Sequence, residues 1–123
     1  MTPCARCGQL PLPGIHHRLS PATGRHLCDP CFAVELDCRL GEALGHLTGV
    51  VKVEAFETHW EIDLTGLFKS IGGNAAEFKD ALKVNCGARC GHSAERCTWL
   101  IDRNQGYQSA LIDWAQWVAG RLA

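Results

Sequence analysis

Apolar positions at helical spacing mark two long segments of the chain. A helix is predicted to begin near Asp29 or Cys31, with Pro30 in its first turn, because apolar residues then recur every three or four positions. The final segment repeats this spacing, widened by Trp117, and predicts a second long helix. The two apolar stripes consist of Phe32, Leu36, Leu40, Ala43, Leu44 and Leu47, and of Tyr107, Leu111, Trp114, Val118 and Leu122.

Between these helices the pattern changes to an alternation of apolar and charged positions. Residues 51–55 and 60–64 alternate in this way, which predicts two half-buried strands joined as an antiparallel hairpin. After the Gly72-Gly73 pair, Asn74 is expected to cap a shorter helix, with Glu77 completing a capping box. The apolar side of that helix would consist of Ala75, Phe78 and Leu82. Together these elements predict an α+β fold.

Composition adds that the charge is unevenly distributed along an ordinary globular chain. The 123 residues are 46% apolar and 20% charged, with a net charge of -1. Residues 1–31 carry three basic and one acidic residue, a net of +2, whereas residues 32–85 carry five basic and nine acidic residues, a net of -4. The near-neutral total therefore combines a basic first segment with an acidic middle.

Two absences bear on the compartment. No segment approaches the roughly 20 apolar residues of a membrane-spanning helix. Residues 1–15 lack the basic start and apolar core of a secretory signal. We therefore expect a cytoplasmic protein without a membrane partner, whose eight cysteines are reduced thiols or metal ligands rather than disulfides.

Four of these cysteines form two C-x2-C pairs, Cys4 with Cys7 and Cys28 with Cys31, separated by twenty residues. Two intervening residues let a tight turn direct both thiolates at one ion, and four sulfurs complete a tetrahedron around Zn²⁺. Gly8 follows the first pair, where such a turn often needs a positive φ. The spacing predicts a structural zinc finger over residues 1–31, followed by a small α+β domain over residues 32–123.

This layout resembles treble-clef and zinc-ribbon fingers, and more weakly a degenerate finger of the HNH endonuclease type. By the HNH resemblance, His17 would be the general base and His16 a ligand of a catalytic metal. Arg25 or His26 replaces the Asn that this family carries before the second knuckle, and residues 32–45 lack its closing His or Asn. A nuclease needs a second metal site with an open position for phosphate, and the missing residues would leave that site incomplete. We therefore expect no enzyme activity.

A second Cys-rich cluster lies at residues 86–97 and predicts another zinc site. Its proposed ligands are Cys86, Cys90, His92 and Cys97. Cys38 is an alternative fourth ligand, because it lies on the polar side of its helix, nearly opposite the apolar stripe. Three structural thiols, a Cys86–Cys97 disulfide and an iron–sulfur cluster are the other interpretations of this segment.

These features predict a non-catalytic zinc-finger binding or adaptor protein. A protein partner held by the acidic middle and an exposed Trp is slightly favoured. Weak nucleic-acid binding by the basic finger is the competing interpretation, with Arg6, His17, Arg18 and Arg25 as the residues that would contact phosphate. Two alternatives are an HNH-like endonuclease or its degenerate DNA-binding relative, and an inhibitor whose acidic surface masks a nucleic-acid-binding partner. No small-molecule substrate is inferred.

Overall fold

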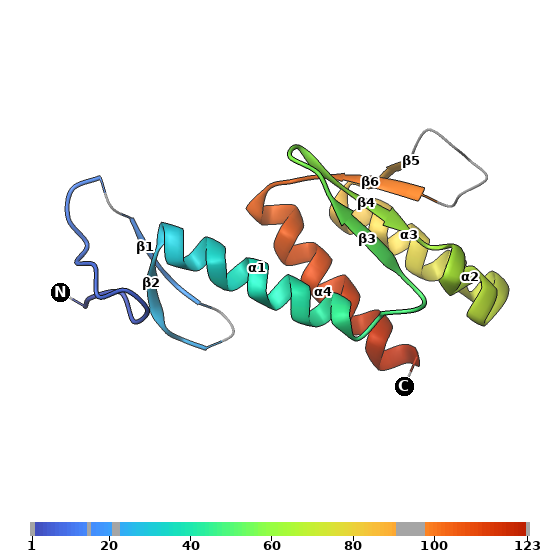
Figure 1. Cartoon of the computed structure of the whole chain (residues 1–123), viewed down its shortest axis with the longest axis horizontal. Coiled ribbons are helices and arrows are strands. Elements are labelled where there is room, and N and C mark those ends of the chain that lie inside the picture. Colours follow the sequence, from blue (N-terminus) through green and yellow to red (C-terminus); the bar gives the residue numbers. More distant parts are fainter. Residues whose placement is uncertain (1, 15, 21–22, 91–97, 123) are drawn as a thin grey trace. The chain divides into compact units, whose positions relative to one another are not determined.

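The computed structural model describes residues 2–14, 16–20, 23–90 and 98–122. The elements follow in the order β1 (His17–Leu19), β2 (His26–Cys28), α1 (Asp29–Gly45), β3 (Lys52–Ala55), β4 (His59–Asp63), α2 (Thr65–Ile71), η1 (Gly72–Asn74), α3 (Ala75–Cys86), β5 (Arg89–Cys90), β6 (Thr98–Asp102) and α4 (Gln105–Leu122) (Figure 1). Helices combined with antiparallel strands confirm the predicted α+β class. Across the described residues, no helix has the length and apolar content needed to span a membrane.

Two compact units, Met1–Cys38 and Arg39–Ala123, make up the chain, and the division falls within α1. In the first unit, β1 and β2 form an antiparallel hairpin in which Arg18 lies opposite Leu27. Helix α1 begins at Asp29, directly after β2, as its Asp-Pro start predicts. Strand β2 is therefore followed directly by α1, with no intervening loop.

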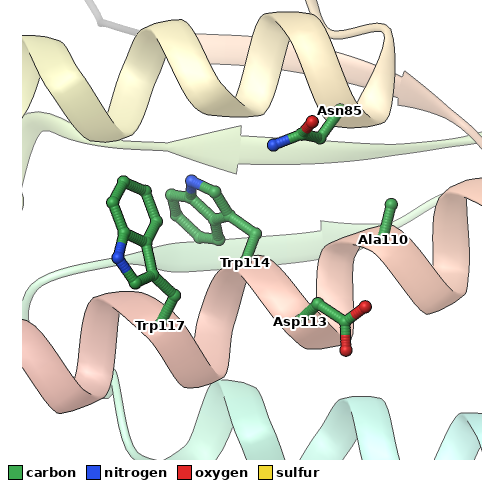
Figure 2. Close-up of a pocket in the computed structure, with 5 residues that line it drawn as sticks. All are labelled: Asn85, Ala110, Asp113, Trp114 and Trp117. Atoms are coloured by element: carbon green, nitrogen blue, oxygen red, sulfur yellow. The ribbon is translucent and has the colours of Figure 1, made fainter.

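The second unit contains a four-stranded antiparallel sheet in the order β3-β4-β6-β5. The β3–β4 hairpin confirms the one predicted from residues 51–55 and 60–64. One face of the sheet carries Trp60, Ile62 and Ile101, all buried, and α3 and α4 cover it (Figure 2). The core of this unit lies between that face and the two helices.

The other face of the sheet, called the open face below, is polar. Apart from the buried Thr98, its side chains are half-buried or exposed and comprise Lys52, Glu54, His59, Glu61, Asp63, Arg89, Leu100 and Asp102. The register sets Lys52 opposite Asp63 but Glu54 opposite Glu61. Like charges directly opposite each other across two strands are destabilising, by roughly 0.2–1 kcal/mol.

The start of α3 corrects the predicted capping box. Asn74 is the last residue of the 3-10 turn η1, its backbone is already helical, and its side chain makes no capping hydrogen bond. The backbone N–H of Ala75 instead donates to the carbonyl groups of Gly72 and Gly73. The glycine pair that we expected to break the chain therefore leads directly into the helix, and no side-chain cap forms.

Strand β6 and helix α2 were not predicted, although both are central to the second unit. Strand β6 lies between β4 and β5. Helix α2 contains Gly66, where an added Cβ would lie 2.7 Å from the backbone oxygen of Val50. Only glycine therefore fits where α2 passes the segment that precedes β3.

Candidate metal centre

The first cysteine pair lies on a tight backbone turn. The N–H of Cys4 donates to the carbonyl of Gln9, and the N–H of Gly8 donates to the carbonyl of Cys4. The N···O distance is 2.9 Å in both hydrogen bonds. Gly8 has a φ of 78°, which confirms the expected left-handed position. This turn points the thiols of Cys4 and Cys7 in the same direction.

The second pair spans the junction between β2 and α1. Cys28 is the last residue of β2, and Cys31 lies in the first turn of α1. A backbone hydrogen bond of 2.7 Å from Ala5 to His26 ties the first turn to the edge of this hairpin. The backbone itself therefore brings the two pairs together, across more than twenty residues of sequence.

The four Sγ atoms lie within 4.8 Å of one another, and those of Cys7 and Cys28 are 3.6 Å apart. Four sulfurs at 2.3 Å from a tetrahedral Zn²⁺ would be separated by about 3.8 Å, so the donor set fits zinc with only small adjustments. All four cysteines are free thiols; three are buried, whereas Cys7 is exposed. The four cysteines are positioned to bind a metal ion, and their thiolate donors suit zinc.

Two thiols of the cluster have pKa values that are shifted in opposite directions. Burial alone would raise the pKa of Cys4, but backbone hydrogen bonds from Cys7, Cys28 and Arg6 lower it to about 5. A backbone hydrogen bond from Cys31 acts to lower the pKa of Cys28, yet burial and hydrogen bonds with the neighbouring thiols raise it to about 12. Binding of a metal ion would require all four thiols to lose their protons, and the charge of the ion would offset part of the negative charge of the thiolates.

Arg6, predicted as a phosphate contact, lies against the metal centre. Its Nη1 donates to the Sγ of Cys31 over 3.8 Å, and this hydrogen bond and the nearby thiolate charge raise the pKa of Arg6. Zinc bound by four thiolates would carry a net charge of -2, so a guanidinium beside the sulfur would stabilise the loaded site. Ligand-orienting partners of this kind tune metal sites.

The other residues predicted to contact nucleic acid are in different environments. Arg18 forms an ion pair of 3.0 Å with Asp29, and its guanidinium lies 5.3 Å from the ring centroid of Phe32. Arg25 is exposed. His17 is half-buried, with neither ring nitrogen hydrogen-bonded. These side chains therefore differ in how far neighbouring groups engage them, and their contact with nucleic acid stays a prediction.

The two histidines of the HNH resemblance are also not gathered into a metal site among the described residues. His16 is exposed, and the ring of His17 lies 4.7 Å from that of His26. Within the described ranges, the only group of three or more His, Cys, Asp or Glu side chains close enough to hold an ion is the cysteine quartet. The expected absence of nuclease activity stays a prediction.

The second predicted zinc site is described only in part. Cys86 ends α3 and is fully buried, and burial together with the charge of Asp113 raises its pKa to about 11. Cys90 is exposed in β5, and Cys38 is exposed on α1. His92 and Cys97 lie outside the described residues. The second site therefore stays a prediction.

Sequence reasoning missed two surface features of the second unit. One is the facing pair Glu54 and Glu61, which the alternation of charges and the short hairpin loop could have revealed once the register was counted. The other is a groove between α3 and α4, which depends on helix packing and has no local sequence signal (Figure 2).

Comparison of this chain with family models, curated proteins and solved structures found no match.

Proposed function

We propose that this chain is a non-catalytic binding protein, in which a zinc-held finger is joined to a unit that docks a basic protein partner. The observation that carries the proposal is the pair Glu54 and Glu61, which lie directly opposite each other on the open face. Neither carboxylate forms a hydrogen bond or ion pair in the described part of the chain. Their mutual repulsion is a cost that a cationic partner would relieve.

The rest of the open face supports this assignment. Asp102 is paired with Arg89 over 2.8 Å, and Lys52 lies opposite Asp63 in the register. These pairs leave the two glutamates, one on the edge strand β3 and one on β4, as unbalanced charge on the face. Complementary charge across an interface speeds association and selects partners more than it adds raw affinity. A partner with Lys or Arg at the matching position would therefore be favoured.

The finger contributes stability under this proposal, rather than chemistry. Four cysteine ligands fill the tetrahedral coordination of zinc and leave no open position for a substrate or water. Its metal would supply folding free energy to a unit that is too small to fold on an apolar core alone.

Nucleic-acid binding by the finger is the second candidate, supported by the exposed side chain of Arg25. It is weaker because Arg18 is engaged with Asp29 and Arg6 with the metal centre. An inhibitory role also fits the open face, since facing carboxylates can mimic phosphate and mask a nucleic-acid-binding surface. An HNH-like nuclease has the least support, since among the described residues neither His16 nor His17 belongs to a group of three or more side chains close enough to hold an ion.

The test is quantitative capture from cell lysate with the immobilised wild-type protein and a Glu54→Gln/Glu61→Gln variant. A matched control, Asp80→Asn, removes an exposed carboxylate from α3 instead. We expect a basic protein to be enriched by the wild type and the control, lost with the double variant, and released by salt. That protein is then purified and its binding measured directly. Equal capture by all three chains would refute a partner at the open face.

A partner-free measurement checks the same argument. If the facing glutamates repel each other, the Glu54→Gln/Glu61→Gln variant should be more stable than the wild type, by about 0.2–1 kcal/mol in urea unfolding. The gain should shrink in high salt, because screening already weakens the repulsion in the wild type. A variant that is less stable at low salt would contradict an unrelieved repulsion on this face.

A further inference from the structure

A cavity open to solvent lies against the metal centre in the first unit. Its volume is about 440 Å³, and three of the four cysteines of the quartet line it: Cys7, Cys28 and Cys31. All of its lining residues belong to Met1–Cys38. The cavity therefore gives small dissolved molecules a direct route to the sulfur atoms.

Cys7 differs from the other members of the quartet in its exposure. Cys4 and Cys28 are 3% exposed and Cys31 is 5% exposed, whereas Cys7 is an exposed residue. The guanidinium of Arg6 adds positive charge beside the cluster, 3.8 Å from the Sγ of Cys31. Reactive cysteines are typically thiolates in partly exposed, electropositive surroundings, and zinc ligation would keep the thiol deprotonated. Cys7 is therefore the thiolate that a dissolved oxidant reaches first.

The sulfur placed to react with an oxidised Cys7 is that of Cys28. Their Sγ atoms are 3.6 Å apart, and both residues line the cavity. A disulfide has an S–S distance of about 2.05 Å, so the two sulfurs need to approach by roughly 1.5 Å. Cys7 belongs to the first C-x2-C pair and Cys28 to the second, so a bond between them would join the two pairs and remove one zinc ligand from each.

We propose that Cys7 is the site at which hydrogen peroxide oxidises the finger, and that a reversible Cys7–Cys28 disulfide forms with release of the metal. This proposal rests on the metal centre and does not depend on a partner at the open face. It adds control by oxidation to the binding role proposed above.

The chemistry takes two steps. The Cys7 thiolate attacks one oxygen of the peroxide and the O–O bond breaks, which gives the sulfenic acid of Cys7 and a hydroxide ion. The Cys28 thiolate then attacks the sulfenic sulfur and the S–O bond breaks, which gives the disulfide and a second hydroxide ion. The two sulfurs together lose two electrons, and these reduce the peroxide to the two hydroxide ions.

Oxidation would leave Cys4 and Cys31 as the thiolates of the site. Two thiolates are half of the four donors that a structural zinc site needs, so they would hold the ion too weakly to retain it. The first unit would then lose the folding free energy that the metal supplies, while the second unit stays folded on its own core. A reductant that restores both thiols would allow the ion to bind again.

The experiment treats the zinc-loaded full chain with hydrogen peroxide and follows zinc release with a chromogenic chelator. Samples are alkylated, digested with trypsin without reduction and analysed by mass spectrometry. Trypsin cleaves after Arg6, Arg18 and Arg25, so Cys4, Cys7 and Cys28 fall in three different peptides. We expect peptides 7–18 and 26–39 to become linked through Cys28 at the same rate as one zinc per chain is released. A dithiol reductant with added zinc should reverse both changes.

Two variants locate the site of oxidation. Cys7→His keeps a zinc donor, because Cys₃His sites are normal for zinc, but it lacks the exposed sulfur, so zinc release should slow at least about tenfold. Cys38→Ser removes an exposed thiol outside the quartet and should leave the rate unchanged.

The linkage in the wild-type chain decides the proposal even if Cys7→His fails to take up zinc. A disulfide between Cys4 and Cys7 in place of the expected one would overturn it, as would zinc release without any disulfide. An unslowed Cys7→His variant that carries zinc would also overturn it.

Discussion

The two units of this chain are stabilised by different means. Among the described residues of Met1–Cys38, half of the buried apolar side chains are cysteines of the quartet; this buried set is Cys4, Leu27, Cys28, Cys31, Phe32 and Leu36. In Arg39–Ala123 the buried set consists mainly of aliphatic and aromatic side chains from the sheet, α2, α3 and α4. In the part of the first unit that the structure describes, few side chains are buried apart from those of the quartet, whereas the second unit has a larger apolar core. Removing metal should therefore affect the two units very differently.

The largest expected effect is loss of the finger when zinc is removed. Chelation, or Cys28→Ser, should unfold the first unit, because structural zinc contributes about 10–16 kcal/mol of apparent binding free energy in comparable peptides. The second unit should remain folded, since its core contains none of the four ligands. Native mass spectrometry should show one fewer zinc per chain for Cys28→Ser. In NMR spectra, signals of residues 1–28 should collapse while those of β4, β6 and α4 persist.

Two results would contradict this comparison. A chelated protein whose finger signals are unchanged would show that residues 1–38 fold without metal. Cooperative loss of both units would show that the second one depends on the first. Cys38→Ser is the matched control for Cys28→Ser, because Cys38 is exposed and lies outside the quartet.

The next largest effect concerns the predicted second ion. If it binds, the second unit also depends in part on metal, and the two units differ less in how they are stabilised. We expect the wild-type chain to carry two zinc ions, one of them held by Cys86, Cys90, Cys97 and a fourth ligand. His92→Ala should remove the second ion and Cys38→Ala should not, because His92 is local to the cluster. One zinc per wild-type chain by native mass spectrometry would reject the site and leave Cys86 as a core thiol.

The sequence predicted the metal centre because its information is local. Two residues between each pair of thiols determine a tight turn, and the chemistry of zinc dictates how the two turns must meet. Strand β6 lacks such a signal. Its Trp99-Leu100-Ile101 run is continuously apolar rather than alternating, which is ambiguous between a buried strand and a helix segment. Its pairing partner β4 lies more than thirty residues earlier in the sequence.

The sequence rule for helix capping failed where backbone carbonyl groups accepted the hydrogen bond that a side-chain cap was expected to accept. Asn74 has the residue type and spacing of a helix cap, but the two preceding glycines form a 3-10 turn whose carbonyls accept the N–H of Ala75. Asn85 and Asp113, which line the groove between α3 and α4, come from different helices, so their proximity depends on how these helices pack. No periodicity in either helix alone contains that information.

A mid-sized effect tests how closely the second unit is packed. Gly66→Ala should destabilise the chain by about 1–3 kcal/mol, because the new Cβ would lie 2.7 Å from the backbone oxygen of Val50, and backbone cannot move aside easily. Gly73→Ala is the matched control. No atom lies within 4 Å of its added Cβ, so it should be neutral or stabilising by up to about 1 kcal/mol. Urea unfolding of the second unit measures both, and equal values would contradict the close approach at Gly66.

The smallest expected effect is binding of duplex DNA by the finger. Each phosphate contact contributes a slope of about -0.9 in log affinity against log salt, and Arg25 is the predicted cation least engaged by neighbouring groups. The slope should therefore lie between about -1 and -3, with a Kd weaker than about 100 μM near 0.15 M salt. Fluorescence anisotropy across a salt series measures both quantities.

Two variants test which arginine contacts phosphate. Arg25→Ala should reduce the slope by about 0.9, whereas Arg18→Ala should change it less, because the Arg18 guanidinium is already paired with Asp29. Sub-micromolar, sequence-selective binding that is lost in either variant would instead make the finger the principal binding surface and the open face secondary.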